Sequence, residues 1–435
     1  MPQYRNSVLA LFLAVCACTS PESTLVPTEP TSSVDSDRNI LLIIADDLGK
    51  DAMPGFSEGA IKPATPTLNG LATSGLTFTN LWVTPTCAPT RASIITGRHG
   101  FRTGVTRSGA ALASTETTLQ AYIASASDRP YKTAVVGKWH LARSASFNPE
   151  SIGIDYYAGV LSSDVDDYYA WPLTSDGVTT TETGYSTEVL TDLAIDWLQA
   201  QDDSWFLWLA YNAPHTPFHV PPTDTHVQGT LPPYQPGMDG LPYYMAAIEA
   251  MDFHIGRLLD SLSPAERAET TVIFIGDNGS PRQTVQAPYT SGTAKGSVYQ
   301  GGINTPMLVS GGQLQRQGTD DSVISSTDLF ATIAELAGVS VSQIHDSRSF
   351  SPLLSAAAPH RDYAYSGIEE AGAGMWTTAR GDQYKLIVRP SGEEQLFDLL
   401  ADPYEGTDLI QLGLTPTQAA ARADLVSWLG SLGIS

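Results

Sequence analysis

The feature that most constrains the fold is a set of short, uninterrupted apolar runs. Asn39–Ala45, NILLIIA, is rich in isoleucine and leucine and lacks alternating polar residues. Such a run is typical of a strand buried on both faces of a parallel sheet. Similar runs occur at Thr133–Val136, Trp205–Tyr211 and Thr271–Ile275, and Met307–Ser310 is a further candidate. Together they predict a buried, mainly parallel central sheet.

Amphipathic helical patterns lie between these predicted strands. Ser186–Gln201 and Tyr243–Leu262 carry apolar residues at three- and four-residue intervals, and Thr327–Ala337 does so until Gly338 ends the pattern. Strands that alternate with helices favour an α/β fold in which helices flank the sheet on both sides. The chain has 435 residues, which is enough for one large α/β domain and a small second one.

The pattern changes near residue 356. Short strand-like runs separated by turn signals follow at Trp376–Arg380, Tyr384–Val388 and Gln395–Asp398, and Thr415–Leu432 is a predicted terminal helix. These runs predict an antiparallel meander. We therefore expect an α/β domain over residues 39–355 and a small C-terminal α+β subdomain, with an antiparallel sheet, over residues 356–435.

The N-terminus resembles a bacterial export signal. Arg5 precedes the apolar run Val8–Ala17, which is too short to span a bilayer, and Val15–Cys18 is similar to a lipobox. Residues 1–18 are therefore predicted to be a signal or lipobox segment, and the polar residues 19–38 a flexible tether. We expect an exported protein, periplasmic or at the cell surface, anchored by a lipid on Cys18; an ordinary cleaved signal peptide is the alternative.

The formal net charge of −23 bears on possible partners. Nucleic acid is excluded as a partner, because neutralising phosphates needs a basic face. An acidic surface also disfavours non-specific attraction to anionic lipid. Such a charge is typical of an adaptation for solubility.

Polar residues gather where the predicted strands end. In open α/β sheets, ligands bind outside the carboxyl ends of the strands, so one rule of topology brings these residues to one rim. The residues that follow the first four strand runs are Asp46, Asp47, Lys138, His140, His215, Asp277 and Asn278.

Four of these residues offer hard oxygen ligands and no thiol. Such a set suits Ca²⁺ or Mg²⁺ rather than zinc. An Asp-Asp pair such as Asp46-Asp47 is by itself more often a solvated turn or a helix cap. Its combination with Asp277-Asn278 at a second strand end favours a metal site.

Cys87 begins a second candidate motif, Cys87-Ala-Pro-Thr-Arg91. Pro89 near its start and Gly97 after it suit a short helix with Cys87 at the N-terminus, where free N–H groups hold anions. Arg91 adds a charged fork for an oxyanion. Loss of the leader leaves Cys87 without a disulfide partner, which hints at a reactive role, although a lone cysteine taken by itself is more often a small buried side chain.

These motifs together resemble the type I sulfatases of the alkaline-phosphatase superfamily. The Cys87–Arg91 motif, with Thr96-Gly97-Arg98 after it, is similar to the signature of that family. Further segments that resemble its motifs, in the same order along the chain, are Asn39–Gly49, Gly137–Leu141, Ala213–Pro217, Gly276–Gly279, Lys295–Gly302 and Gln395–Pro403.

The resemblance implies an alkaline-phosphatase-like fold and a sulfatase activity. It implies that a formylglycine-generating enzyme or an anaerobic sulfatase-maturing enzyme oxidises Cys87 to formylglycine. One hydroxyl of the hydrated aldehyde would attack the sulfur of a sulfate ester and release the alcohol. Loss of a proton from the other hydroxyl would then release sulfate, whereas an unmodified Ser or Cys would keep it as a stable ester or thioester.

The resemblance also assigns roles by position. The residues that would hold one Ca²⁺ ion are Asp46, Asp47, Asp277, Asn278 and modified Cys87. Arg91 would stabilise the nucleophile, and His140 would take the proton when the diol collapses. The residues that would bind sulfate oxygens and assist the leaving oxygen are Lys138, His215 and Lys295.

Two positions depart from the family pattern. The motif at Lys295 usually continues with Glu and Arg, where this chain has Gln300 and Asn304. We interpret both as changes in the surroundings of the site that leave the reaction class intact. The Tyr- and Asp-rich stretch Asp155–Gly177 is either a sugar platform beside the site or a loop that packs on the domain.

Three functions are compatible with these motifs. The favoured one is hydrolysis of a sulfate ester on a carbohydrate or a small molecule. A phosphomonoester or phosphonate-monoester hydrolase of the same superfamily is the second. A non-catalytic surface lipoprotein that binds sulfated glycans is the third, and retention of every motif residue argues against it. The alcohol released and endo- or exo-action depend on loops that do not transfer between relatives.

The lipobox-like run predicts a lipid on Cys18. Wild-type protein expressed in bacteria should partition into a detergent phase, and Cys18→Ala should move it to the aqueous phase, because the acyl chains supply the membrane affinity. Equal partitioning of both proteins into water would favour ordinary secretion.

Overall fold

The computed structural model describes residues 1, 3, 39–142, 147–161 and 164–434. The predicted lipobox segment and tether lie outside these residues, apart from residues 1 and 3, so the lipid on Cys18 stays a prediction. Among the described residues, no helix combines the length and the apolar character needed to cross a bilayer.

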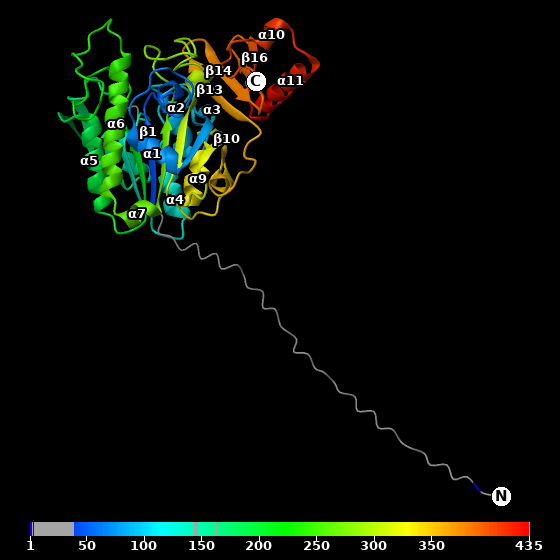
Figure 1. Ribbon diagram of the computed structural model, residues 1–435, viewed down its shortest axis with the longest axis horizontal. Coiled ribbons are helices and arrows are strands. Elements are labelled where there is room, and N and C mark those ends of the chain that lie inside the picture. The colour runs from blue at the N-terminus through cyan, green and yellow to red at the C-terminus, as the bar shows by residue number, and fades with distance from the viewer. Residues whose placement is uncertain (2, 4–38, 143–146, 162–163, 435) are drawn as a thin grey trace. The chain divides into compact units, whose positions relative to one another are not determined.

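A ten-stranded sheet forms the centre of the described chain, in the order β10-β2-β9-β8-β1-β7-β3-β4-β5-β6 (Figure 1). Its strands are β1 (Asn39–Ala45), β2 (Leu76–Trp82), β3 (Lys132–Lys138), β4 (Tyr156–Val160), β5 (Trp171–Ser175), β6 (Val178–Glu182), β7 (Trp205–Ala210), β8 (Thr270–Gly276), β9 (Asn304–Ser310) and β10 (Gly318–Ser325).

Strand β1 lies in the middle and pairs in parallel with β7 and β8. Strand β3 continues the parallel arrangement between β7 and β4. Strand β9 runs antiparallel to its two neighbours, β8 and β2. The chain from β8 to β9 stays at one rim of the sheet, so β9 runs back in the opposite direction to β8. All seven residues of β1 are buried, as an apolar strand in the middle of a covered sheet requires.

Helices cover both faces of the sheet, as predicted. Alternate residues of β1 point to opposite faces, so Leu42 and Leu41 belong to two separate cores. On the Leu42 side the covering helices are α2 (Cys87–Thr96), α4 (Leu119–Ala126) and α9 (Asp328–Leu336). On the Leu41 side they are α1 (Pro66–Ser74), α5 (Ser186–Gln199) and α6 (Leu241–Ser261).

Short elements connect these layers. They are the 3₁₀ turns η1 (Lys50–Ala52), η2 (Pro149–Ile152) and η3 (Ser351–Leu354), the helices α3 (Gly100–Thr103), α7 (Pro264–Glu269), α8 (Gln300–Ile303) and α10 (Leu409–Leu412), and the hairpin strands β11 (Gln343–Ile344) and β12 (Ser347–Arg348).

A second, four-stranded antiparallel sheet follows, which confirms the predicted meander. Its strands are β13 (Ala364–Glu370), β14 (Gly374–Arg380), β15 (Tyr384–Val388) and β16 (Glu394–Asp398), and helix α11 (Pro416–Ser431) packs on them. Two hydrogen bonds join this sheet to loops at the carboxyl-terminal rim of the central parallel strands. Ser366 donates a hydrogen bond to the Val83 carbonyl, and the Lys385 ammonium donates to that of Val298.

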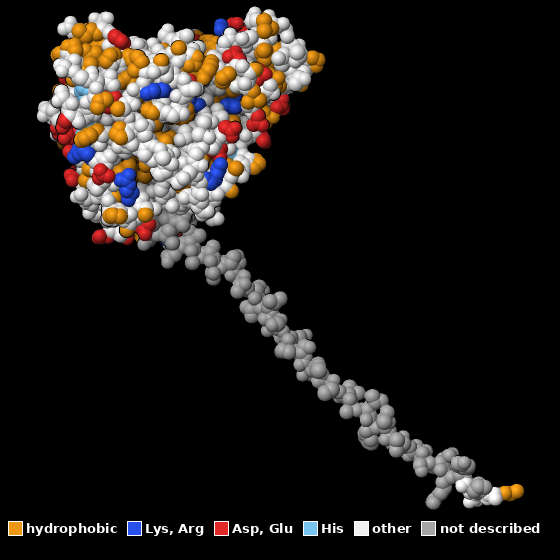
Figure 2. Space-filling model, viewed as in Figure 1, with side chains coloured by type: hydrophobic (Ala, Val, Ile, Leu, Met, Phe, Trp, Pro, Cys, Tyr) orange, Lys and Arg blue, Asp and Glu red, His pale blue; other side chains and the backbone are white. Residues whose placement is uncertain are grey.

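The surface is mixed in character. On the face drawn in Figure 2, acidic and basic side chains are interspersed among apolar and neutral ones.

Candidate active site

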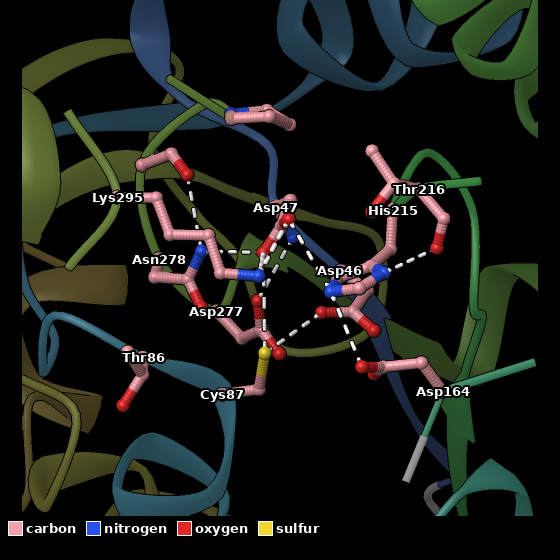
Figure 3. A network of polar contacts seen from close by, with 12 residues as sticks. Asp46, Asp47, Thr86, Cys87, Asp164, His215, Thr216, Asp277, Asn278 and Lys295 are labelled. Atoms are coloured by element: carbon pink, nitrogen blue, oxygen red, sulfur yellow. Dashed lines mark hydrogen bonds and ion pairs between the residues drawn. The ribbon is translucent and has the colours of Figure 1, made fainter. Parts of the chain in front are cut away.

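The predicted site residues follow the carboxyl ends of the central strands. Asp46 and Asp47 come directly after β1, and Asp277 and Asn278 directly after β8. The parallel ladder continues into these residues, because the Asp277 N–H donates to the Ala45 carbonyl at 3.1 Å. Figure 3 shows their side chains turned toward one another. The topology therefore brings together residues that are 230 positions apart in the sequence. The Asp47 N–H donates a hydrogen bond to Asp277 Oδ1 at 3.1 Å.

Helix α2 delivers Cys87 to the same point. Cys87 is the first residue of the helix and is buried, and its Sγ lies 3.1 Å from Asp46 Oδ1 and 3.8 Å from Lys138 Nζ. Gly97 ends the helix in the left-handed region, at φ 66°. The positive φ favours glycine, and a Cβ there would also make a tight contact of 3.0 Å with the Phe330 ring. The predicted helix is thus present, with Cys87 at its N-terminus.

Arg91 links the helix to two strand ends. Its Nε and Nη2 donate to one oxygen of Asp277 at 3.0 and 2.7 Å, and its Nη1 donates to the Lys138 carbonyl at 2.7 Å. Arg91 is fully buried, so this guanidinium is held in one place by charged and polar partners. The Lys138 ammonium in turn donates to Asp46.

Asp47 is the partner of the remaining side chains. Lys295 Nζ lies 2.6 and 2.7 Å from its two oxygens, and Asn278 Nδ2 donates to Oδ1 at 2.7 Å. His215 Nε2 lies 3.6 Å from Asp47 Oδ2, while its Nδ1 is 2.6 Å from the Thr216 carbonyl. The contact with Thr216 fixes the ring so that Nε2 faces the site.

The donor set fits a divalent cation. Asn278 Oδ1 is buried and has no hydrogen-bond partner among the described residues, which is costly for an amide oxygen unless a cation or a donor faces it. Asp46, Asp47, Cys87 and His215 each offer a ligand atom, and these atoms lie within 4.8 Å of one another. Carboxylate and amide oxygens are the ligands that Ca²⁺ and Mg²⁺ prefer. This tight group contains His215 rather than the predicted Asp277, which is turned toward Arg91.

Burial and charge set the protonation of the site. Burial, and then the charge of Asp46, raises the pKa of the Cys87 thiol well above its ordinary value. An unmodified thiol here is therefore protonated at neutral pH and is a poor nucleophile. Burial opposes ionisation of Asp46, but the charges of Lys138, His215 and Arg91 outweigh it and hold the pKa of this carboxyl well below its ordinary value.

His140 lies in the same buried group. Burial, and then the charge of Lys138, lowers the pKa of His140 to about 3, so its ring is neutral at neutral pH. Its Nδ1 is buried without a hydrogen-bond partner in the part of the chain that the structure describes, and its backbone adopts φ 60°. A neutral imidazole with an unbonded nitrogen is able to accept a proton.

Asp164 is a site residue that the sequence did not single out. Its carboxylate accepts from Lys138 Nζ, and its Oδ2 lies 3.6 Å from His215 Nε2. Asp164 belongs to the Tyr-rich connection between β4 and β5, where no strand end marks it. The only available signal was an acidic residue within the stretch Asp155–Gly177.

That stretch is mainly a packed support. Tyr157, Tyr168 and Trp171 are buried, whereas Tyr169 remains 38% exposed. The Tyr168 hydroxyl donates to the carbonyl of His215 at 2.8 Å and so positions the histidine turn.

The two positions that depart from the family pattern lie outside this group of contacts. The Gln300 N–H donates to Glu405 at 2.6 Å, and Asn304 Nδ2 donates to Asn80 at 3.4 Å. Arg380, from β14, donates to the same Asn80 oxygen at 3.1 Å. A guanidinium from the C-terminal sheet therefore lies beside Asn304.

A model of the sulfatase family matches residues 38–339. The chain belongs to the sulfatase family. It is 28% identical over 381 residues to the uncharacterized sulfatase YdeN of Escherichia coli K12, in a match covering 73% of this chain and 65% of YdeN. It is 27% identical over 347 residues to human N-acetylgalactosamine-6-sulfatase, in a match covering 69% of this chain and 62% of the relative. The chain thus spans just under two thirds of the length of these relatives.

Among solved structures, this sulfatase-family chain is similar to Ps i-CgsB. The crystal structure of Ps i-CgsB in complex with k-i-k-neocarrahexaose has a TM-score of 0.77, is 24% identical, and covers 90% of this chain and 92% of that one. A second crystal structure of Ps i-CgsB has a TM-score of 0.76 and 26% identity. The predicted family and fold class are confirmed.

Divalent metal should stabilise the folded protein through Asn278. We expect CaCl₂ to raise the Tm of EDTA-treated wild type, because a ligand at 100 times its Kd adds about 2.7 kcal/mol. Asn278→Ala should lose most of this rise, whereas Asn69→Ala, an exposed position on α1, should keep it. Calorimetry of the three proteins measures the effect, and a wild-type Tm that is the same with EDTA and CaCl₂ would contradict the site.

Proposed function

We propose that this protein hydrolyses sulfate monoesters with a formylglycine derived from Cys87 as the nucleophile. The observation that carries the proposal is the placement of Cys87 at the buried N-terminus of α2, with Sγ 3.1 Å from Asp46 and three cations around the carboxylates. The high pKa of the thiol argues against an unmodified cysteine as the nucleophile. Hydrated formylglycine supplies one hydroxyl that attacks sulfur and a second whose deprotonation releases sulfate.

We propose Ca²⁺ as the metal of this site. Asp46, Asp47 and Asn278 would hold it together with the modified residue 87. Asp277 would contribute through Oδ1, because Arg91 occupies its Oδ2. When bound, the cation supplies Lewis-acid stabilisation of negative charge on the nucleophile and on a sulfate oxygen. The orphaned Asn278 Oδ1 and the all-oxygen set of the four side chains support a hard cation.

The cationic side chains of this chain would bind the sulfate group. Lys138 and Lys295 place ammonium groups beside Asp46 and Asp47, and His215 directs Nε2 to the same point. These donors match an oxyanion that gains charge as the ester bond breaks, and fixed donors of this kind are effective in a buried site. Arg91 holds Asp277 and the end of β3 in place, and so orients the nucleophile side.

His140 would accept the proton that leaves when sulfate is released. Its ring is neutral before this step and its Nδ1 has no hydrogen-bond partner among the described residues, while a pKa of about 3 makes it a weak base. A general base needs a free lone pair and a position within hydrogen-bond reach of the proton.

We propose a carbohydrate as the carrier of the sulfate. The human relative named N-acetylgalactosamine-6-sulfatase supports a sugar sulfate as the substrate class. A maturation enzyme of the formylglycine-generating or anaerobic sulfatase-maturing class would act on Cys87. The N-terminal pattern supports action outside the cytoplasm, in the periplasm or at the cell surface.

Sulfate monoesters should be preferred over phosphate monoesters. The three buried carboxylates of the site offset its three cations, so one bound divalent ion leaves two positive charges. An ionised nucleophile takes one of them and a sulfate monoester the other, whereas a phosphate monoester carries nearly two negative charges at neutral pH. Each ~1.4 kcal/mol of lost transition-state stabilisation lowers the rate about tenfold. The value of kcat/KM should therefore be at least about tenfold higher for 4-nitrophenyl sulfate than for 4-nitrophenyl phosphate.

The two substrates share one leaving group, so the comparison isolates the transferred group. Lys138→Met, which removes one cation from Asp46, should lower kcat/KM for the sulfate. A phosphate value equal to or above the sulfate value would favour a phosphomonoester or phosphonate-monoester hydrolase instead.

A further inference from the structure

A cavity of about 440 Å³ lies between the segment that follows Lys295 and the C-terminal sheet. Its walls are the segment Gly296–Tyr299, the end of β13 at Ile368–Glu370, and the side chains of Arg282 and Trp376. This volume falls within the range of about 300–1,000 Å³ typical of small-molecule sites. The cavity is therefore large enough to hold part of a ligand.

The cavity shares its wall with the candidate active site. Lys295, whose ammonium reaches Asp47, is followed by Gly296, which lines the cavity. The Gly296 N–H donates at 2.8 Å to the carbonyl of Pro85, two residues before Cys87. One turn of the chain thus presents Lys295 to the active site and Gly296 to the cavity, so the cavity lies across this turn from the active site.

A larger cavity of about 580 Å³ is not placed for this role. Thr270 and Val272 line it, so it lies at the amino end of β8, opposite the end that carries Asp277. Its Arg267 is paired with Asp260.

Trp376 gives the smaller cavity a fixed aromatic wall. Its Nε1 donates to Glu370 at 2.7 Å, and the Arg389 guanidinium lies 5.2 Å from the ring centroid. These contacts hold the plane of a ring that lines the cavity. Large, rigid aromatic faces with a polar edge suit ligands that are apolar on one face and rich in hydroxyls at their edges, as sugar rings are.

Arg282 gives the cavity an available positive charge. Its Nε donates to the Lys295 carbonyl at 3.1 Å, and the ion pairs formed by the described residues do not include it. The wall also carries two carboxylates: Glu370 accepts a hydrogen bond from Trp376, and Glu369 accepts one from Thr106 and lies 3.9 Å from the Arg107 guanidinium. A planar guanidinium suits a sulfate or a carboxylate.

We propose that this cavity binds a saccharide unit next to the one that carries the sulfate to be removed. Trp376 packs against the ring of that unit, and Arg282 binds a sulfate or carboxylate group on it. The substrate class is then an oligosaccharide with more than one anionic group, rather than a simple aryl sulfate. This inference rests on the proposed sulfatase function, because the active site next to the cavity sets the ligand.

Binding is tested first, on full-length protein in which Cys87 is unmodified, so that no turnover interferes. The probes are k-i-k-neocarrahexaose and sulfated chondroitin and heparan oligosaccharides, titrated by calorimetry. For the tightest probe, Arg282→Gln and Trp376→Ala should each raise the Kd at least about tenfold, because the first removes a hydrogen bond between charged groups and the second removes the aromatic face.

Two remote substitutions are the matched controls. Arg267→Gln removes an arginine from the other end of the sheet, and Phe253→Ala removes an exposed aromatic ring of α6. Both should leave the Kd unchanged. Failure of every probe to bind, or equal effects of the controls and the cavity variants, would overturn the proposal.

Turnover then separates the cavity from the active site. In matured protein, Arg282→Gln and Trp376→Ala should lower kcat/KM for the oligosaccharide more than for 4-nitrophenyl sulfate. Equal losses on both substrates would mean that Arg282 acts by holding Lys295, which would overturn the proposal. Absence of sulfate release by wild type, with binding still sensitive to Arg282, would instead contradict the proposed sulfatase function alone.

Discussion

The site depends on one electrostatic constraint, the balance of three buried carboxylates against three cations. Asp46, Asp47 and Asp277 stand at the ends of β1 and β8, and Arg91, Lys138 and Lys295 approach them from a helix, a strand and a loop. Each of these six charges would be very unfavourable if it were buried without a partner of opposite charge. Substituting any one of them by a neutral residue should therefore destabilise the site. Loss of one partner from a buried pair costs about 3–5 kcal/mol. These ion pairs therefore hold the helix, strands and loop of the site in fixed relative positions.

The scaffold around this charge cluster explains how its geometry is kept. Strand β1 is flanked by parallel strands on both sides, so Asp46 and Asp47 start from a rigid position. Tyr244 donates to the Asp47 carbonyl at 2.7 Å, and Ser280 donates to Asp51 at 2.7 Å just behind it. Residues at the ends of such strands keep their relative positions while loops around them vary, which suits a family that changes substrates on one fold.

Much of this arrangement follows from sequence patterns. Asn39–Ala45 was predicted as a strand and is β1 to the residue, because an unbroken apolar run has few other folded states. β2 was not predicted, since its sequence LTFTNLW mixes polar residues into a half-buried strand. The strand-end rule found the three carboxylates and Lys138, whereas Arg91 came from the helix motif at Cys87 and Lys295 from the family resemblance. Asp164 was missed because a loop contact depends on the tertiary path of the chain. The cavity beside Lys295 depends on how the C-terminal sheet packs, and no local pattern encodes that packing.

The central claim is that residue 87 in its oxidised form carries turnover. Its most direct test uses protein samples co-expressed with graded amounts of a maturation enzyme. Mass spectrometry of the tryptic peptide that contains Cys87 gives the converted fraction, and sulfate release from 4-nitrophenyl sulfate is measured on the same samples. The account predicts a rate that rises in proportion to the converted fraction and extrapolates to zero when all of Cys87 is unmodified. Full activity in protein that contains only unmodified Cys87 would contradict it.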